Sequence, residues 1–474
     1  MLDVLLIRAD RLQTGGHPRH RHPPLDLWYA EAGLMEAGMA VALLDLWVPA
    51  DRARLVDYRR DPPALVVIKG ESWCLEESRE LAASFRARGA ITLAVGQQAY
   101  HYPAHRCGDQ GWDLVVPGEC EQALVALVPD LLQHGLDSAP ARACRRRLWQ
   151  RQPYQTQPER LPRPRRQTER LADYPFPLPV RGRVVRRWGY VQSAWGCPYA
   201  CTHCTDVVRK SSGARLRRRP VAQVVDQIAE LLAAGAEGIV FEDDTLFCSP
   251  AHLLALCAEI QRRGLCFAWV ANARPDELDA RRVAAAAAAG AVLLKLGIET
   301  GSNRLAQRLG KAVAGQCWRQ HCERGLGLLA EAGVGALGLL MTGIPGEDAA
   351  LAARTRHWVA GLPLDYVQVQ VFTAYPEVRL GQGEPGLGNQ YHYPVAGGIP
   401  LAPLADGIAP AAAADLQRRL YRRFYARPGF VLRHLRRCWR WYLCGANLRA
   451  LAGWTGYVLR RQRVPGTATG LGGT

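Results

Sequence analysis

Three cysteines with the spacing C-x3-C-x2-C point more directly to chemistry than any other residues of the chain. They are Cys197, Cys201 and Cys204, and they follow the apolar run at 190–194. Three thiolates this close together can hold three irons of a cubane iron–sulfur cluster and leave the fourth iron open to an exchangeable molecule. A structural zinc site would usually bring a second pair of ligands, and no such pair stands at a suitable distance. Three unconnected structural cysteines are the alternative.

This loop resembles the signature of the radical S-adenosylmethionine (SAM) enzymes, in which an aromatic residue precedes the third cysteine. His203 holds that place here and keeps a flat ring there. The resemblance implies a 4Fe–4S cluster anchored by the three cysteines, with SAM on the open iron and His203 among its contacts. Reduction of the cluster would cleave SAM and release a 5′-deoxyadenosyl radical, which is chemistry of the cofactors.

Strand-like runs alternate with helical segments after the cysteine loop. Six strand–helix repeats resemble the partial, TIM-like (β/α)6 barrel of the radical SAM enzymes. In parallel barrels the functional residues gather at the carboxyl ends of the strands. The expected strands are residues 190–194, 238–241, 267–271, 292–298, 335–341 and 366–372.

The first expected SAM contacts at these strand ends are polar. Asp243, with Asp244 beside it, offers carboxylates that suit the ammonium group of SAM, although Asp244 or Thr245 equally suits a helix N-cap. Asn272 and Arg274 follow the third strand. A guanidinium there can bind a carboxylate, either that of SAM or that of an acidic substrate.

The resemblance adds two contacts further along the barrel. Glu299, in a segment similar to the family's Gly-x-Glu-Ser, is expected near the ribose hydroxyls of SAM. Gly343 begins Gly-Ile-Pro-Gly, and the family uses this region against adenine. Glycine permits the close backbone approach that such a contact needs.

The first 135 residues predict a separate α/β domain. Strand-like runs at 4–7, 41–44, 65–68, 91–95 and 114–116 alternate with helical runs at 25–37, 76–87 and 121–133. This alternation predicts a doubly wound, Rossmann-like parallel sheet whose ligand crevice lies beyond the carboxyl ends of the strands. No G-x-G-x-x-G follows the first strand, which argues against a dinucleotide.

The loops at these strand ends resemble the cobalamin-binding domain that precedes the radical SAM core in one large subgroup. The similar features are a Pro-Pro-Leu opening and a Gly-Glu-x-Glu segment after the last strand. The motif D-x-H-x-x-G is absent, so no histidine is expected below the cobalt; Trp73 either packs there or fills the domain core. The expected cobalamin contacts are Pro24, Gly70, Trp73, Gly96, Gly118 and Glu119.

The remaining segments predict a linker and a tail. Residues 136–186 are rich in proline, arginine and glutamine, which favours an extended, solvated linker. Residues 187–375 then form the catalytic barrel, and 376–474 form a mostly helical extension that includes a helix at 415–437. Aromatic residues alternate with arginines after position 438, which predicts either a lid helix or peripheral contact with an anionic membrane.

Composition limits the class of protein. The 474 residues suffice for two or three domains, and nearly all the positive charge in the net +17 is arginine. We interpret this charge as spread along the chain and expect no nucleic-acid partner. The N-terminus has no signal-peptide pattern, no apolar run is long enough to span a membrane, and the clustered thiols need reducing conditions. These features predict a cytoplasmic protein.

The sequence therefore predicts an α/β enzyme of the cobalamin-dependent radical SAM subgroup that methylates a carbon of a small-molecule, lipid or peptide substrate. A flavodoxin or ferredoxin would serve as reductant. Three alternatives stay open. One is ring closure or rearrangement, with or without cobalamin. Another is RNA methylthiolation, which would need three more cysteines in the first domain and a small C-terminal barrel. The third is a non-enzymatic iron–sulfur or nucleic-acid-binding protein.

Overall fold

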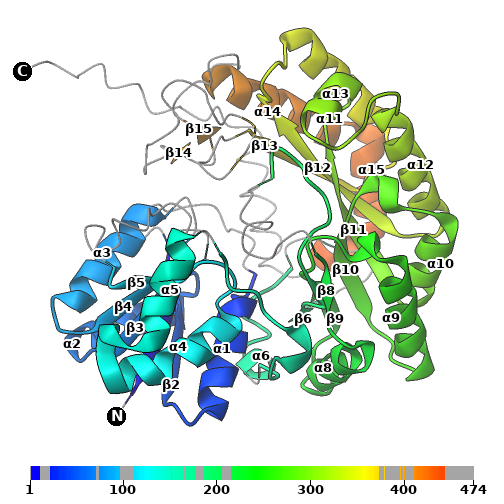
Figure 1. Ribbon diagram of the computed structural model, residues 1–474. Coiled ribbons are helices and arrows are strands. Elements are labelled where there is room, and N and C mark those ends of the chain that lie inside the picture. Colours follow the sequence, from blue (N-terminus) through cyan, green and yellow to red (C-terminus); the bar gives the residue numbers. More distant parts are fainter. Residues whose placement is uncertain are drawn as a thin grey trace, which may run out of the picture.

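Two parallel sheets organise the protein, as a computed structural model shows. They lie side by side, the first in blue and cyan and the second in green and yellow (Figure 1). The structure describes residues 2–10, 22–70, 74–96, 112–150, 152–164, 166–176, 179, 185–204, 215–372, 378, 380, 395–396, 399–400 and 410–442.

The first sheet has five parallel strands in the order β2-β1-β3-β4-β5, which is the order of flavodoxin-like doubly wound sheets. All five expected strands form. Every residue of β1 is buried, because helices cover both faces of the sheet. Four of its five residues are apolar, and the fifth, Arg8, is paired with Asp45 of β2. The strands are β1 (Val4–Arg8), β2 (Val41–Asp45), β3 (Leu65–Lys69), β4 (Ile91–Val95) and β5 (Leu114–Val115).

Alternate residues of these strands face different helices. Val4 and Leu6 belong to the buried cluster that includes Trp28 of α1, whereas Leu5 and Ile7 belong to the cluster of α2 and α3. Helix α2 was not expected, because its polar sequence buries only two side chains. The helices are α1 (Leu25–Glu36), α2 (Pro49–Arg60), α3 (Leu75–Arg86) and α4 (Glu121–His134), followed by the 3-10 turn η3 (Gly135–Asp137).

The described part of the segment at 136–186 is not the extended, solvated linker that its composition predicts. It contains α5 (Ala139–Trp149), η4 (Pro158–Arg160) and the short α6 (Arg166–Glu169). Tyr174 is 1% exposed, and its hydroxyl donates to Asp45 at 2.7 Å. A few well-placed apolar and aromatic side chains thus hold this proline-rich segment against the first sheet. Average composition does not reveal them.

The second sheet has six parallel strands in chain order, as expected for six βα repeats. Among the described residues, β6 and β13 form its two edges, so the sheet does not close. The first strand begins earlier than predicted and ends at Val191. The strands are β6 (Trp188–Val191), β9 (Gly238–Phe241), β10 (Ala268–Ala273), β11 (Ala291–Glu299), β12 (Gly335–Thr342) and β13 (Tyr366–Val371).

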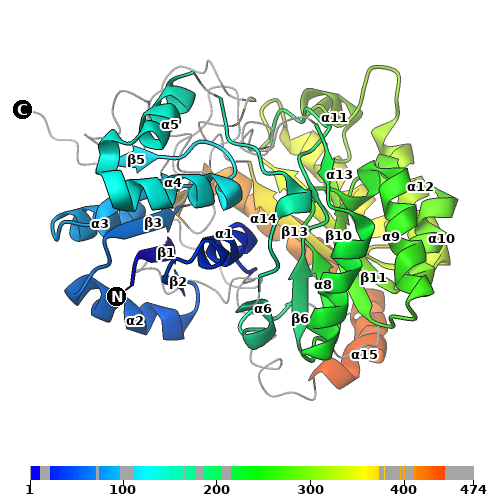
Figure 2. The same cartoon turned by 60° about the horizontal axis from the view of Figure 1, so that its bottom comes forward.

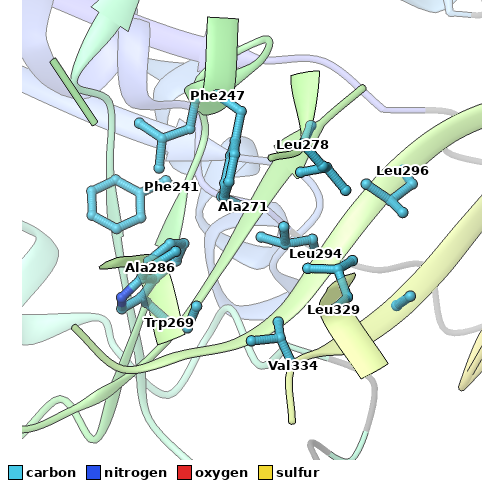
Figure 3. Close-up of a cluster of buried hydrophobic side chains, with 14 of the residues drawn as sticks. Phe241, Phe247, Trp269, Ala271, Leu278, Ala286, Leu294, Leu296, Leu329 and Val334 are labelled. Atoms are coloured by element: carbon cyan, nitrogen blue, oxygen red, sulfur yellow. The ribbon is translucent and has the colours of Figure 1, made fainter. Parts of the chain in front are cut away.

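Helices cover the outer face of this sheet (Figures 1 and 2). Trp269 of β10 packs edge-on against Phe241 of β9, with ring centroids 5.5 Å apart, and both face the helices through the cluster in Figure 3. The covering elements are α8 (Val221–Ala233), η5 (Leu246–Cys248), α9 (Pro250–Arg262), η6 (Pro275–Glu277), α10 (Ala280–Ala288), α11 (Asn303–Arg308), α12 (Trp318–Glu331) and α13 (Ala349–Gly361).

Two short antiparallel ribbons complete the described strands. The first joins β7 (Ala194–Trp195) to β8 (Arg217–Arg218), and the second joins β14 (Val395–Ala396) to β15 (Ile399–Pro400). The first ribbon brackets the cysteine loop, so whatever holds this ribbon also positions the three thiols.

The predicted helix at 415–437 is two helices, α14 (Pro410–Tyr425) and α15 (Pro428–Tyr442), because Pro428 interrupts the helical hydrogen bonding. Helix α14 covers the edge of β13. The Tyr421 hydroxyl meets the backbone of Val369, and the Tyr425 hydroxyl meets the backbone of Val367. Four residues of helix and two of strand span nearly the same length, so the hydroxyls match alternate strand residues.

None of the described helices is long and apolar enough to cross a membrane.

Candidate functional site

The predicted SAM contacts on the barrel all lie at one edge of the six-stranded sheet. Because neighbouring strands are parallel, their carboxyl ends meet at that edge. Glu299 ends β11 and Asn272 lies one residue before the end of β10. Asp243, Asp244, Arg274 and Gly343 follow the ends of β9, β10 and β12.

The cysteine loop is anchored to the segment after α11. The backbone N–H of Thr202 donates to Leu309 O at 3.0 Å, and its hydroxyl donates to Arg308 O at 2.7 Å. Gly310 has φ +69°, and a Cβ there would lie 3.1 Å from Ala200 O. Glycine at this position therefore lets the two segments approach closely.

Arg274 lies directly against the thiols. Its Nη1 is 3.3 Å from Cys201 Sγ, and its guanidinium carbon is 3.9 Å from the centre of the Tyr199 ring. The other guanidinium nitrogens bond both carboxylate oxygens of Asp276, at 2.9 and 2.8 Å. The side chain is 8% exposed. Arg274 is thus a fixed cation beside the cysteine loop, and its fork is already filled by Asp276.

The donor set of the loop fits an iron–sulfur cluster. Among the described residues no three His, Cys, Asp or Glu side chains form a ready-made site for a single metal ion. The three thiols are nevertheless near enough that Cys201, in addition to burial, raises the pKa of both Cys197 and Cys204. Burial raises the pKa of Cys197 to about 11. Cluster ligation requires thiolates, so binding would release protons. The Arg274 cation and the nearby Lys311 offset the negative charge that three thiolates bring.

Glu299 stands at a strained point of β11. It is the one residue other than glycine with a positive φ, +61°, among the described residues, and the pairing register with β12 shifts there. Its Oε1 lies 3.1 Å from Lys311 Nζ and 3.6 Å from His203 Nε2. Burial raises its pKa, but Lys311 and His203 outweigh burial and hold the pKa at about 2. Backbone strain of this kind clusters at functional sites.

Asp243 is buried and its carboxylate is occupied. Its two oxygens accept from the hydroxyl of Ser193 at 2.8 Å and from the backbone N–H of Ser193 at 3.1 Å. Asn272 Nδ2 donates to Asp243 O at 2.8 Å. His252 also contacts the Ser193 hydroxyl, at 3.1 Å. Ser193 is fully buried and the aspartate bonds the serine instead of the histidine, so these three residues are no hydrolytic triad.

Asp244 differs from its neighbour because its side chain is exposed. The protein around it and the carboxylate of Asp243 nevertheless raise its pKa to about 7. Of the two residues expected as a possible helix N-cap, Thr245 holds the N-cap position of η5 and Asp244 does not. Thr245 makes no capping bond, because its hydroxyl donates to Glu277 at 2.5 Å. Asp244 is therefore the carboxylate of this pair that a cationic ligand can reach.

Gly343 serves the packing of α14. It has φ +73°, its N–H donates to Glu347 Oε2 at 2.6 Å, and a Cβ there would lie 3.1 Å from Ala413 Cβ. The loop that follows β12 and the start of α14 are consequently in contact at this edge of the sheet.

Three of the predicted cobalamin contacts lie at the carboxyl edge of the first sheet. Pro24 immediately precedes α1, Gly70 follows β3 and is buried, and Gly96 follows β4 with φ +79°. A Cβ on Gly96 would approach Lys69 Cγ to 3.0 Å. These positions border the crevice that the doubly wound topology predicts. Trp73 lies outside the described residues.

Gly118 and Glu119 have other partners. A Cβ on Gly118 would lie 2.4 Å from Tyr154 O, since the two residues form a β-bridge. Glu119 accepts both guanidinium ends of Arg217, at 2.7 and 2.6 Å, and the N–H of Thr156 at 2.5 Å. Its side chain is 6% exposed. Glu119 thus joins the first domain to β8, and its carboxylate is filled by protein.

Glu121 extends this junction to the cysteine loop. Its Oε1 accepts from Trp195 Nε1 at 3.0 Å, and Oε2 accepts from the Thr156 hydroxyl at 3.0 Å. Burial, with Glu119 nearby, raises its pKa to about 8. We call Glu119, Glu121, Thr156, Trp195 and Arg217 the interdomain junction.

Sequence reasoning missed Lys311 and Arg217. Lys311 is one of only four lysines in this arginine-rich chain, which was a usable signal. No sequence signal distinguished Arg217, because it is one arginine among several at 215–219 and its partner, Glu119, is 98 residues away.

Comparison with known proteins identifies the class of domain. Residues 193–359 match the Radical SAM superfamily, a stretch that begins just before the cysteine loop and ends within α13. The chain therefore contains a radical SAM domain, and such a domain implies a 4Fe–4S cluster and SAM.

Particular relatives come from Pyrococcus horikoshii and Kitasatospora setae. An uncharacterized methyltransferase of Pyrococcus horikoshii is 27% identical over 194 residues, which are 41% of each chain, so the chain spans about two fifths of this relative. Two structures of the radical SAM methyltransferase TsrM from Kitasatospora setae share 21% and 22% identity, with TM-scores of 0.60 and 0.59. Each covers 80% of this chain and 74% of TsrM. At this identity the likeness shows a shared fold.

Proposed function

We propose that the protein is a cobalamin-dependent radical SAM enzyme that methylates an unactivated carbon of a small-molecule, lipid or peptide substrate. The observation that carries this proposal is the position of the cysteine loop. Arg274 and the Glu299–Lys311 pair lie on its barrel side, and Glu119 and Glu121 tie the ribbon beside it to the first domain.

The cluster with SAM would supply a radical or a methyl group, and cobalamin would carry the methyl group to the substrate. In this proposal the residues of the chain hold the cofactors and orient them. Cys197, Cys201 and Cys204 ligate the cluster, and Arg274 offsets its charge. Asp244 receives the ammonium group of SAM, since Asp243 is occupied by Ser193.

Two observations support cobalamin in the first domain. The sheet has the doubly wound order, and Pro24, Gly70 and Gly96 border its ligand edge. The TsrM structures, one of which has cobalamin and a 4Fe–4S cluster bound, cover 80% of this chain, a share far larger than the barrel alone. Of the six expected contacts, we retain these three and Trp73. We leave out Glu119, which belongs to the junction, and Gly118, which pairs with Tyr154.

RNA methylthiolation has less support from the described residues. Cys74 and Cys120 belong to buried hydrophobic clusters on opposite faces of the first sheet, so they cannot ligate the same iron–sulfur cluster. Cys107 lies outside the described residues. The described part of the tail at 410–442 is helical. Ring closure or rearrangement would use the same site as methylation, and the mass of the product separates these reactions.

The site is tested by Cys201→Ala after anaerobic reconstitution with iron and sulfide. We expect loss of iron–sulfur absorbance and of SAM cleavage, because three thiolates are needed to hold the cluster. Cys257→Ala, at a buried cysteine of α9 away from the loop, is the matched control and should keep both. Full cluster absorbance and SAM cleavage in Cys201→Ala would refute the assignment.

The cobalamin proposal has its own readout. The protein purified with hydroxocobalamin should retain a cobalamin visible spectrum after gel filtration. With a flavodoxin or ferredoxin as reductant and SAM carrying a deuterated methyl group, we expect substrates to gain that methyl group. A product of unchanged or dehydrogenated mass would favour ring closure or rearrangement.

A further inference from the structure

The outer face of α15 exposes a stripe of large apolar side chains. Val431, Leu432, Leu435 and Trp439 are 44%, 56%, 48% and 52% exposed. They are half of the eight exposed large hydrophobic side chains among the described residues, and they lie on one helix of 15 residues. At 100° per residue they share one face of α15, which we call the α15 stripe.

The α15 stripe is not the face that packs on the protein. Phe430 and Cys438 are 8% and 5% exposed, and the His434 ring stacks on Phe430 with centroids 5.5 Å apart. Arg437 reaches Asp365 at 3.3 Å, just before β13 begins. Phe430, His434 and Cys438 therefore bind α15 to the start of the barrel strands and leave the stripe exposed on the adjoining side of the helix.

Two stretches of the sequence carry the positive charge, residues 136–219 and residues 416–474, and the second of them contains this helix. Residues 416–474 contain 13 arginines and neither lysine, aspartate nor glutamate, whereas the whole chain has a net charge of +17. The interpretation that the charge is spread along the chain is therefore wrong. Within α15, Arg433 and Arg436 are exposed. At 100° per residue Arg436 adjoins the stripe, and Arg433 lies between Arg436 and the packed face, where it lines a pocket with Phe430 and His434.

The arginines of this segment require a partner with negative charge. The aliphatic side chains of the stripe decide whether that partner is a nucleic acid or an anionic bilayer. Single-stranded nucleic acid binds through arginines and through aromatic rings that stack on bases. The aliphatic side chains of Val431, Leu432 and Leu435 cannot stack on bases. Contact with a phosphate backbone would not remove their apolar surface from water. An aliphatic stripe bordered by arginines, with a tryptophan on it, is the pattern of a helix that lies in the interface of an anionic bilayer.

We propose that α15 attaches the protein to anionic lipid bilayers, with the stripe in the lipid and the arginines at the headgroups. This goes beyond the proposed reaction and does not depend on it. Helix α15 lies near the starts of the barrel strands, at the lower rim in Figure 2, whereas the cysteine loop lies at their ends. Attachment therefore leaves the site accessible.

The test is flotation of the full chain with vesicles of phosphatidylcholine alone or of equal parts phosphatidylcholine and phosphatidylglycerol. We expect binding to the anionic vesicles, weakened by salt, and little binding to phosphatidylcholine. Leu432→Ser/Leu435→Ser and Arg433→Gln/Arg436→Gln should each weaken binding by about tenfold or more. Met35→Ser/Val56→Ser, at apolar positions 58% and 60% exposed on the first domain, is the matched control and should bind as the wild type does.

All variants should keep the wild-type thermal unfolding midpoint and rate of SAM cleavage, because the substituted side chains are exposed and distant from the site. Vesicle binding that survives the leucine substitutions would overturn the proposal. Two other results would overturn it in favour of a different partner. One is binding to polyuridylate that requires the arginines but not the leucines; the other is self-association, without vesicle binding, that the leucine substitutions abolish.

Discussion

Adjacent carboxyl groups after β9 have different surroundings, and this difference assigns their roles. Asp243 holds Ser193, two residues beyond β6, whereas Asp244 is exposed beside the cysteine loop. The same contrast recurs at Glu119, which sequence reasoning assigned to cobalamin and which the structure gives to Arg217. At the scale of single residues, a carboxylate is available to a ligand only where its oxygens are not already bonded to other residues of the protein.

The contrast predicts different effects for Asp244→Asn and Asp243→Asn. Asp244→Asn should weaken SAM binding about tenfold, because one charge-assisted contact to the ammonium group is lost, and should leave stability unchanged. Asp243→Asn should cost about 2 kcal/mol of unfolding free energy, since a buried hydrogen-bonded carboxylate is replaced. Equilibrium binding of SAM and urea unfolding measure the two effects. Equal SAM affinity in Asp244→Asn and the wild type would contradict the assignment.

Glu121 makes stability depend on pH. Its pKa is raised by burial to about 8 in the folded protein, whereas an unfolded glutamate titrates near its ordinary value of about 4.3. The folded state therefore binds the extra proton between these values. Its stabilising effect is fully present below the unfolded pKa and is lost as pH rises through about 8.

Glu121→Gln should consequently flatten the decline of unfolding free energy between about pH 5 and pH 8. Glutamine keeps an oxygen for Trp195 Nε1 and carries no charge. Urea unfolding at several pH values measures the slope. Glu331→Gln, an exposed glutamate at the end of α12, is the control and should retain the wild-type slope. An unchanged slope in Glu121→Gln would show that Glu121 is ionised when folded.

At the scale of elements, α14 closes the edge of β13 with side chains. A sheet edge normally leaves backbone N–H and C=O groups unpaired. Here the Tyr421 and Tyr425 hydroxyls donate to and accept from the strand, and Gln417 Nε2 donates to Val369 O at 2.7 Å. The helix thus replaces a seventh strand at this edge.

Tyr421→Phe/Tyr425→Phe should lower the unfolding free energy by about 2–4 kcal/mol, because buried backbone groups lose their partners. The amides of Val367 and Val369 should exchange hydrogen faster, while those of β11 should not. Hydrogen exchange with mass spectrometry resolves these segments. Tyr58→Phe, whose hydroxyl bonds an exposed arginine, is the control and should cost little. Unchanged exchange in β13 would contradict the role of the hydroxyls.

At the scale of the whole molecule, the interdomain junction fixes the first domain relative to the cysteine loop. Arg217 and Glu119 form a bidentate pair whose side chains are 15% and 6% exposed, and Thr156 contributes its N–H and its carbonyl to the same pair. Because the junction lies beside the loop, its geometry sets the distance between the two expected cofactors.

Arg217→Met/Glu119→Gln should separate the two domains functionally. SAM cleavage, which needs the barrel alone, should stay within about twofold of the wild type, whereas methyl transfer should fall about tenfold or more, because misplacement by an ångström is costly in catalysis. Calorimetry should show two unfolding transitions in place of one. Arg262→Met/Glu259→Gln, an ion pair on the surface of α9, is the control. Parallel loss of cleavage and transfer would contradict the proposed role.

Much of the fold could be predicted because its signals are local. Strand runs such as 4–7 and 65–68 are apolar throughout, and helix α4 has clear apolar spacing. Helix α2 and the packed segment at 166–176 could not be predicted in this way. Their few buried side chains matter only through partners far along the chain, as Tyr174 does through Asp45.

The sequence by itself determined the C-x3-C-x2-C loop, the strands that follow it and the edge where the polar residues gather, since spacing and periodicity are properties of short segments. Only the tertiary structure decided how those residues are used. Arg274 is held by Asp276, Glu299 is paired with Lys311, and Glu119 is bound to an arginine 98 residues away. The physical reason is that a charge inside a protein is defined by the neighbours that compensate it, and folding brings those neighbours together.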